Sequence, residues 1–411
     1  MSADRKPCSP ADPSRRPANQ SDVRRRNLAL LSRLIFEADA APSRADLTIS
    51  TGLGRATVSR LVQDLIAGGL VQEEAPGDSP GRGRPATPLA PARGTIAAIG
   101  LETNVHFVAG RAIDLTGATL SEFRLSGFGA FDDPAKTLSL LGDSAATMAL
   151  GLRNAGVRIA GAALAIPGLV NTRDNGLLVA PNLDWSDFNP IDLLGDRWHE
   201  CAIPTRARND ADLQSLAAAY ARPGRVRTRS TFLYLAGDIG IGGALVRDGG
   251  LTRGDHGWAG EIGHVTVDPD GPPCACGSRG CLEAYAGQAS VLLAAGLPAD
   301  STAEELIERA DAEDGCAISA IERAGWALGI AISDVINVLD VAHIIFGTSL
   351  GRLLPKLRPA LEEGLRARVL GLGHRGVELV SGPAIDSPAC TGGAFDVLQS
   401  VVCDPAIHMI D

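Results

Sequence analysis

The chain has 411 residues, a formal net charge of −10 and 45% hydrophobic residues, so it is long enough and apolar enough for two or three folded domains. It contains no uninterrupted run of about 18 apolar residues and no apolar signal core near its start, so we expect a cytoplasmic protein without a membrane segment. The charge is uneven: residues 1–95 hold 14 Lys and Arg against 10 Asp and Glu, and the rest holds 24 against 38. A basic N-terminal part on an acidic body predicts a polyanionic partner for that part alone.

The N-terminal pattern predicts a disordered tail over residues 1–22 and a helical domain over 23–94. Ser43 and Asp46 have the spacing of a capping box before a second helix, and the glycines of 52–54 predict a sharp turn before a third. Apolar residues at helical spacing mark the first and third helices: Leu28, Leu31, Leu34 and Ile35, then Ala56, Val58, Leu61, Val62 and Leu65. A short strand, a Gly/Pro/Arg-rich loop and a return strand complete a winged helix-turn-helix.

The polar side of the third helix would lie in the major groove of duplex DNA, and arginines of the loop between the two strands would hold phosphates or enter the minor groove. The alternative is a three-helix packing module with a solvated charged face; the wing arginines and the local positive charge favour DNA binding. The residues expected to contact operator DNA are Arg44, Arg55, Thr57, Ser59, Arg60, Gln63, Arg82 and Arg84.

From about residue 95 the pattern changes, and 95–411 is expected to form one effector domain. Predicted strands cover 95–102, 105–114, 118–125, 159–170, 230–246 and 341–347, and predicted helices cover 133–156, 210–222, 302–314 and 317–340. Strands that alternate with helices indicate an α/β body. Two glycine-rich strand–turn regions favour two lobes around a cleft.

A cysteine cluster stands out in this body. His264 is followed by Cys274, Cys276 and Cys281 within a stretch rich in glycine and proline. Thiolates and imidazole are preferred ligands of Zn²⁺, and four of them close a tetrahedron without a bound water, which is typical of a structural site. Buried free thiols or redox-active cysteines are the alternative. The spacing therefore predicts a zinc site made by these four residues.

The same segment carries a family resemblance. The pattern E-x-G-H over 261–264 and C-x-C-G-x-x-G-C-x-E over 274–283 resembles the signature of the ROK family (repressors, open reading frames, kinases). The stretches "LAIPGLVN", "APNLDW" and "RNDADLQSLAAAY" resemble further ROK blocks, and the N-terminal part is similar to the DNA-binding domain of ROK repressors. The resemblance implies an α/β, two-lobed actin/hexokinase-like fold after a winged helix-turn-helix, with a sugar in the interlobe cleft.

The resemblance also implies the residues that bind the sugar. Asn209 and Asp210 match the Asn-Asp pair that binds sugar hydroxyls, and Asp210 matches the general base of kinase members. Glu261, His264 and Glu283 match further sugar ligands, so that His264 would face the metal with one ring nitrogen and the ligand with the other. Taken alone, Asp210 reads better as a cap of the following helix, Asn209 as a turn residue, and Glu261 could be a surface carboxylate.

The kinase phosphate loop, in contrast, is degenerate. Kinase members begin the first lobe with D-x-G-G-T, where small residues let backbone N–H groups approach phosphate. Here the segment reads Glu102-Thr103-Asn104-Val105-His106, and Asp238 stands in the second phosphate segment where a negative charge would repel nucleotide phosphates. We therefore do not expect an enzyme.

The leading hypothesis is a sugar-responsive transcriptional regulator, and specifically a repressor, that binds two DNA half-sites as a homodimer or homotetramer. An ATP-dependent sugar kinase with an added DNA-binding domain is the first alternative. A constitutive DNA-binding protein with a vestigial cleft is the second.

Overall fold

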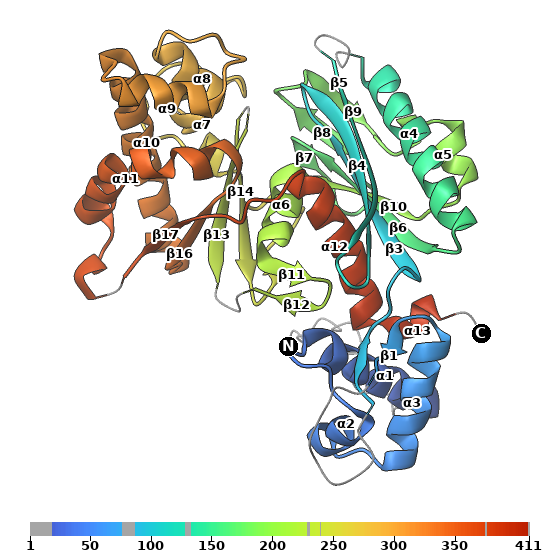
Figure 1. The fold of residues 1–411 in the computed structure, drawn as a ribbon. Coiled ribbons are helices and arrows are strands. Elements are labelled where there is room, and N and C mark those ends of the chain that lie inside the picture. The colour runs from blue at the N-terminus through green and yellow to red at the C-terminus, as the bar shows by residue number, and fades with distance from the viewer. Residues whose placement is uncertain are drawn as a thin grey trace, which may run out of the picture. The chain divides into compact units, whose positions relative to one another are not determined.

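The computed structural model describes residues 19–75, 87–127, 133–227, 231–238, 240–374 and 376–409 (Figure 1). The predicted wing residues Arg82 and Arg84, and most of the predicted tail, lie outside these ranges. Contacts within the chain separate two compact units. One unit comprises Met1–Ala90 with Val401–Asp411, and the other comprises Pro91–Ser400. The C-terminal residues, which the sequence analysis assigned to the effector domain, thus group with the N-terminal unit.

Three helices build the N-terminal unit: α1 (Gln20–Glu37), α2 (Arg44–Thr51) and α3 (Arg55–Ala67). The capping box at the start of α2 is confirmed, because Ser43 and Asp46 exchange side-chain-to-backbone hydrogen bonds. Gly52 ends α2 in the left-handed region at φ 69°, which glycine adopts without a Cβ penalty. Val58, Leu61, Val62 and Leu65 are buried as expected. Ala56 is exposed, because it shares the outer face with positions three, four and seven residues later.

A small two-stranded ribbon follows α3. Strands β1 (Val71–Glu73) and β2 (Leu89–Pro91) pair with each other, as predicted for the two strands of a wing. The C-terminal helix α13 (Pro405–His408) packs on α1, where Arg25 forms an ion pair with Asp404. The described part of this unit is consistent with a winged helix-turn-helix.

The first sheet of the larger unit has the order β10-β6-β3-β4-β5. Its strands are β3 (Ile96–Thr103), β4 (Phe107–Asp114), β5 (Thr119–Ser126), β6 (Arg158–Ile166) and β10 (Thr205–Asn209). β3, β4 and β5 form an antiparallel meander, whereas β6 and β10 continue parallel to β3. All eight residues of β3 are buried, as expected for a central strand covered on both faces.

The second sheet repeats this plan with the order β17-β16-β13-β14-β15. Its strands are β13 (Phe232–Gly237), β14 (Ile241–Arg247), β15 (Gly250–Leu251), β16 (His343–Phe346) and β17 (Glu378–Ser381). Again an antiparallel meander comes first and two parallel strands follow on its other side. The two sheets therefore form two lobes of one architecture, and Figure 1 shows α6 and α12 between them.

The helices of this unit cover the two sheets. They are α4 (Pro134–Asn154), α5 (Asp196–Glu200), α6 (Asp210–Ala219), α7 (Glu283–Ala286), α8 (Gln288–Ala294), α9 (Ala303–Asp311), α10 (Gly315–Leu339), α11 (Thr348–Arg368) and α12 (Pro388–Cys403). Two small sheets complete it: β7 (Leu169–Val170) with β8 (Leu177–Ala180) and β9 (Trp185–Phe188), and β11 (Tyr220–Arg222) with β12 (Arg225–Val226). Each lobe has its own apolar core.

Helix α10 is, within the described ranges, the one helix whose length and composition would allow it to cross a membrane. Its most apolar window has a mean hydropathy of 1.2, and 56% of that window is buried. It packs along α11, and twelve of its residues are buried. This environment is that of the core helix of a globular lobe.

Candidate ligand cleft and metal centre

The structure brings all five predicted sugar-binding residues to one cavity of about 400 Å³. They come from both lobes: Asn209 ends β10, Asp210 starts α6, and Glu283 starts α7. Glu261 and His264 lie at the short 3₁₀ turn Ile262–His264. The lining also includes Asn104, Asn182 and Asp238, which the prediction did not place in the sugar site.

Asn209, and not Asp210, caps helix α6. The Asn209 Oδ1 accepts hydrogen bonds from the N–H groups of Ala211 at 2.8 Å and Asp212 at 3.3 Å, and its Nδ2 donates to the Gly168 carbonyl at 3.0 Å. The capping interpretation was therefore correct in kind and off by one residue. It leaves the Asp210 carboxyl available to the cavity.

The acidic groups of the cavity are protected from water. Burial, together with the nearby Asp238 carboxylate, raises the pKa of Asp210 to about 6. Burial likewise raises the pKa of Glu261 to about 7, with Asp210 and Glu283 adding like charge. The Glu261 carboxyl has no hydrogen-bond partner in the described ranges, so it can accept or donate to a ligand hydroxyl.

Glu283 connects the cavity wall to strand β14. Its Oε2 accepts a hydrogen bond from the Ile241 N–H at 2.9 Å. A Cβ at Gly240 would lie 2.0 Å from that oxygen, so only glycine permits the approach. One carboxylate oxygen of Glu283 therefore holds the protein backbone, and the other remains for a ligand.

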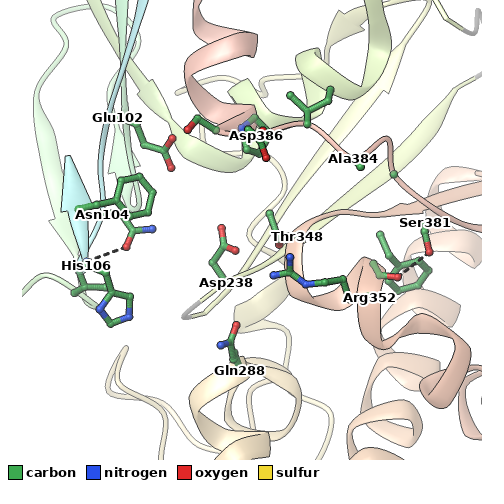
Figure 2. A pocket seen from close by; sticks show the side chains of 18 of the residues that line it. Glu102, Asn104, His106, Asp238, Gln288, Thr348, Arg352, Ser381, Ala384 and Asp386 are labelled. Carbon is green, nitrogen blue, oxygen red and sulfur yellow. Dashed lines mark hydrogen bonds between the residues drawn. The ribbon is translucent and has the colours of Figure 1, made fainter. Parts of the chain in front are cut away.

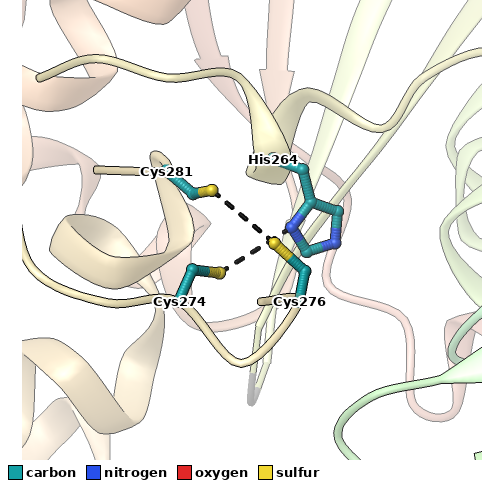
Figure 3. A group of neighbouring side chains, drawn as sticks. All are labelled: His264, Cys274, Cys276 and Cys281. Atoms are coloured by element: carbon teal, nitrogen blue, oxygen red, sulfur yellow. Dashed lines mark hydrogen bonds between the residues drawn. The ribbon is translucent and has the colours of Figure 1, made fainter. Parts of the chain in front are cut away.

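The histidine and three cysteines form a cluster beside this cavity (Figure 3). One ligand atom from each of His264, Cys274, Cys276 and Cys281 lies within 4.8 Å of all the others. Cys276 Sγ is 3.7 Å from Cys281 Sγ, and Cys274 Sγ is 3.9 Å from His264 Nδ1. Both His264 and Cys276 also line the cavity. The cluster could hold a metal ion whose ligands touch the ligand-binding space.

Tight backbone geometry brings the three thiols together. Gly280 has φ 66°, and a Cβ there would lie 1.6 Å from the Asp268 carbonyl oxygen. The Cys274 N–H donates to the Ser278 carbonyl at 2.9 Å, and the Gly277 N–H donates to the Cys274 carbonyl at 3.0 Å. The glycines of this loop are thus required by its closure rather than by flexibility.

Comparison with known proteins identifies the family. A family model described as the ROK family matches residues 99–399. This chain belongs to the ROK family. The predicted family is therefore confirmed, together with the two-lobed α/β fold of ROK proteins.

Individual ROK relatives extend over different parts of the chain. The xylose repressor of Bacillus subtilis (strain 168) is 27% identical over 398 residues, which cover 96% of this chain and 99% of the repressor. A glucokinase of Halalkalibacterium halodurans is 28% identical over 256 residues, which cover 58% of this chain and 76% of the glucokinase. A solved ROK family transcriptional regulator, a homologue of the E. coli MLC protein, covers 93% of this chain and 97% of its own, with TM-score 0.76 and 24% identity.

The β3–β4 turn contains the segment that was predicted to correspond to the kinase phosphate loop, and two of its N–H groups form hydrogen bonds within the turn. The Asn104 N–H donates to the Phe107 carbonyl at 3.0 Å, and the His106 N–H donates to the Asn104 Oδ1 at 3.1 Å. Val105 packs against the apolar core of the first lobe. These two N–H groups are satisfied within the turn and are not left for a phosphate.

The predicted DNA-contacting residues of α3 lie on its outer face. Arg55, Ser59, Arg60 and Gln63 are exposed and Thr57 is half-buried, opposite the buried apolar side. Arg44 is different, because it forms an ion pair with Glu73 on β1. Arg44 therefore connects α2 to the ribbon. To contact DNA as predicted, its guanidinium would have to bind Glu73 and a DNA group at the same time.

Proposed function

We propose that this chain is a DNA-binding transcriptional repressor of carbohydrate metabolism whose affinity for its operator is set by a sugar in the smaller cavity. The observation that carries the proposal is a β3–β4 turn whose Asn104 and His106 N–H groups are hydrogen-bonded within the turn. This turn lies next to a cavity that contains all five predicted sugar-binding residues. We infer that such a cleft binds a sugar, while the described β3–β4 turn leaves neither the Asn104 nor the His106 N–H group for a transferable phosphate.

The extent of the relatives supports the same function. The xylose repressor matches the chain from its N-terminal unit through its body, whereas the glucokinase matches a little more than half of it. The exposed polar residues of α3 supply the donors and acceptors that reading base edges requires. We further propose that two copies place two such helices on two half-sites, and that lobe closure around the sugar changes their spacing.

We propose Zn²⁺ as the metal of the cysteine cluster. Zn–S bonds of about 2.3 Å and Zn–N bonds of about 2.0–2.1 Å at tetrahedral angles need ligand atoms about 3.6–3.8 Å apart. The Cys276–Cys281 Sγ distance of 3.7 Å fits this requirement. The Cys274 Sγ to His264 Nδ1 distance of 3.9 Å is slightly longer, so a small contraction of the cluster would accompany metal binding. The ion would hold the loop that presents His264 to the sugar, and the four protein ligands leave it no open position for catalysis.

The test measures DNA binding and phosphoryl transfer on the same purified full-length protein. A random duplex library selects the preferred operator, and fluorescence anisotropy then gives its Kd with and without each of a panel of sugars. We expect one sugar to change the Kd by a factor of 5–150, the usual range of about 1–3 kcal/mol for allosteric coupling. No selected duplex, or no sugar that changes its affinity, would refute the proposal.

The alternative function, an ATP-dependent sugar kinase, is favoured by the glucokinase similarity. It predicts sugar-dependent release of ADP at rates typical of enzymes, about 1 s⁻¹ or more. We expect no release above the background of the Asp210→Asn variant, which lacks the candidate general base.

A further inference from the structure

A second and larger cavity, of about 890 Å³, adjoins the sugar site. It lies between the end of β3, the start of α11 and the segment 381–388 (Figure 2). The two cavities share the residues Asn104 and Asp238. They are therefore two chambers of one cleft, and a ligand held only in the smaller chamber would leave most of the cleft to water.

Two buried side chains at the junction are only partly satisfied. Glu102 is 4% exposed, and among the residues that the structure describes its one hydrogen-bond contact is the weak thiol donor of Cys390, 3.7 Å from its Oε2. Asn104 is 9% exposed, and its Oδ1 accepts from the His106 N–H while its NH₂ group has no partner in the described ranges. Both side chains point into the cleft (Figure 2). Polar groups of buried side chains that line a cavity are normally satisfied by a ligand or an ordered water.

The charge of the larger chamber disfavours a polyanion. Its lining contains more carboxyl groups than guanidinium groups: Glu102, Asp238, Asp300 and Asp386 against Arg124 and Arg352. A nucleoside triphosphate would bring several negative charges next to Asp238, at the junction itself. Carboxyl groups are, in contrast, good partners for hydroxyl groups, because they accept hydrogen bonds when charged and also donate when protonated.

One wall of this chamber also suits a sugar ring. The Arg124 guanidinium lies 3.4 Å from the centroid of the Phe107 ring, and both residues line the chamber. This stacked pair presents a flat surface next to the polar groups, where the C–H face of a pyranose can pack.

We propose that the ligand of this chain is an uncharged glycoside of at least two linked sugar units. The first unit binds in the smaller chamber, and the second passes Asp238 and Asn104 into the larger chamber, where it displaces water from Glu102. The proposal rests on the proposed sugar-responsive function and specifies its ligand class.

Isothermal titration calorimetry on the full-length protein tests the proposal. The ligands are glucose, xylose, galactose, mannose and N-acetylglucosamine, each as the free sugar and as its linear homodisaccharides. We expect at least one disaccharide to bind about tenfold or more tightly than its own monosaccharide. A non-hydrolysable ATP analogue should not compete with it.

A cavity-filling variant locates the second unit. Ala384 lies on an exposed segment that lines the larger chamber only, so Ala384→Trp should remove the disaccharide advantage and leave monosaccharide affinity unchanged. Ala312→Trp, an exposed site outside both chambers, is the matched control and should change neither.

The outcomes separate the inference from the proposed function. If a monosaccharide changes operator affinity but no disaccharide binds more tightly, or if Ala384→Trp leaves the advantage intact, the inference is wrong and the proposed function stands. Competition by the ATP analogue would also overturn the inference. If no sugar of either kind changes operator affinity, the proposed function itself fails.

Discussion

Asp396 on helix α12 offers the sharpest test of how the two lobes are held together. Its carboxylate lies 2.8 Å from Arg206 Nε, 4.0 Å from Arg208 Nε and 3.5 Å from an amino nitrogen of Arg253. Arg206 and Arg208 belong to β10 of the first lobe, whereas Arg253 follows β15 of the second. Asp396 is 11% exposed, so one nearly buried carboxylate connects both lobes through three cations.

The magnitude follows from what Asp396→Asn leaves behind. Three guanidinium groups would then face one another, with Asp212 as the remaining acid. Because burial raises the pKa of Asp212 to about 7, this carboxyl is only partly ionised near neutral pH and neutralises little of their positive charge. Removing one partner of a buried charge pair costs about 3–5 kcal/mol. Because the Arg206 and Arg253 side chains are 30% and 37% exposed, solvent screens part of the repulsion between the cations. We therefore expect Asp396→Asn to lower the free energy of unfolding by about 3 kcal/mol.

The assay is urea denaturation of the larger unit, followed by near-ultraviolet circular dichroism, with Asp311→Asn as the matched control. Asp311 pairs with Lys356 on the surface, at 60% and 36% exposure, so the control should lose no more than about 0.5 kcal/mol. Asp396→Asn should also weaken the effect of sugar on operator affinity. The loop from Arg253 leads to Glu261, and the Ala259 N–H donates to the Arg253 carbonyl at 3.2 Å. Equal stability of the two variants would refute the reasoning.

Three further predictions concern the metal, pH and DNA. Cys281→Ser should abolish zinc retention after dialysis, measured by atomic absorption, and weaken sugar binding through His264; Cys316→Ser, at an exposed cysteine outside the cluster, should do neither. The pKa values of Glu102 (about 8), Asp212 (about 7) and Asp210 (about 6) all exceed the usual values near 4, so the native state keeps protons that the unfolded state loses. Stability should therefore fall between about pH 4 and pH 8 and then level off, as denaturation midpoints will report; a rise across this range would contradict it. Arg60→Ala should weaken operator binding by about 1–3 kcal/mol in anisotropy titrations, whereas Arg33→Ala, exposed on α1, should change it little, and equal losses would argue against α3 as the reading helix.

The sequence predicted most strands and several helices because their apolar periodicity is strong. Helix α4, helix α10 and strands β3 to β5 lie where the pattern placed them. Helix α11 was not predicted, because Pro355 and Pro359 interrupt its pattern, and proline normally ends a helix. Its buried leucines, among them Leu350, Leu353, Leu357 and Leu361, compensate by packing on the second sheet and α10.

The repeated strand order of the two sheets could not be predicted from the sequence either, because the two lobes have the same strand order without a visible sequence repeat. In the first lobe a single helix, α4, connects the meander to the first parallel strand, whereas in the second lobe the segment from α7 to α10 fills the same connection. Insertions of this size conceal a repeat from any comparison of spacings. Pairing between strands far apart in sequence, such as β13 with β16, reveals it.

The candidate site shows what a motif can and cannot specify. The cysteine spacing located the candidate metal site because its four residues are close in sequence, so local loop geometry alone brings three of them together. The role proposed for Asn104 could not be predicted, because it depends on how near a turn of the first lobe lies to Asp238 of the second, and no spacing in the sequence gives this. From the sequence, Asn104 was interpreted as replacing a glycine of the kinase phosphate loop, and this interpretation stays a prediction. Only the fold places the same side chain at the junction of two chambers, where the proposed loss of nucleotide binding and the proposed binding of a second sugar unit would have a single structural cause.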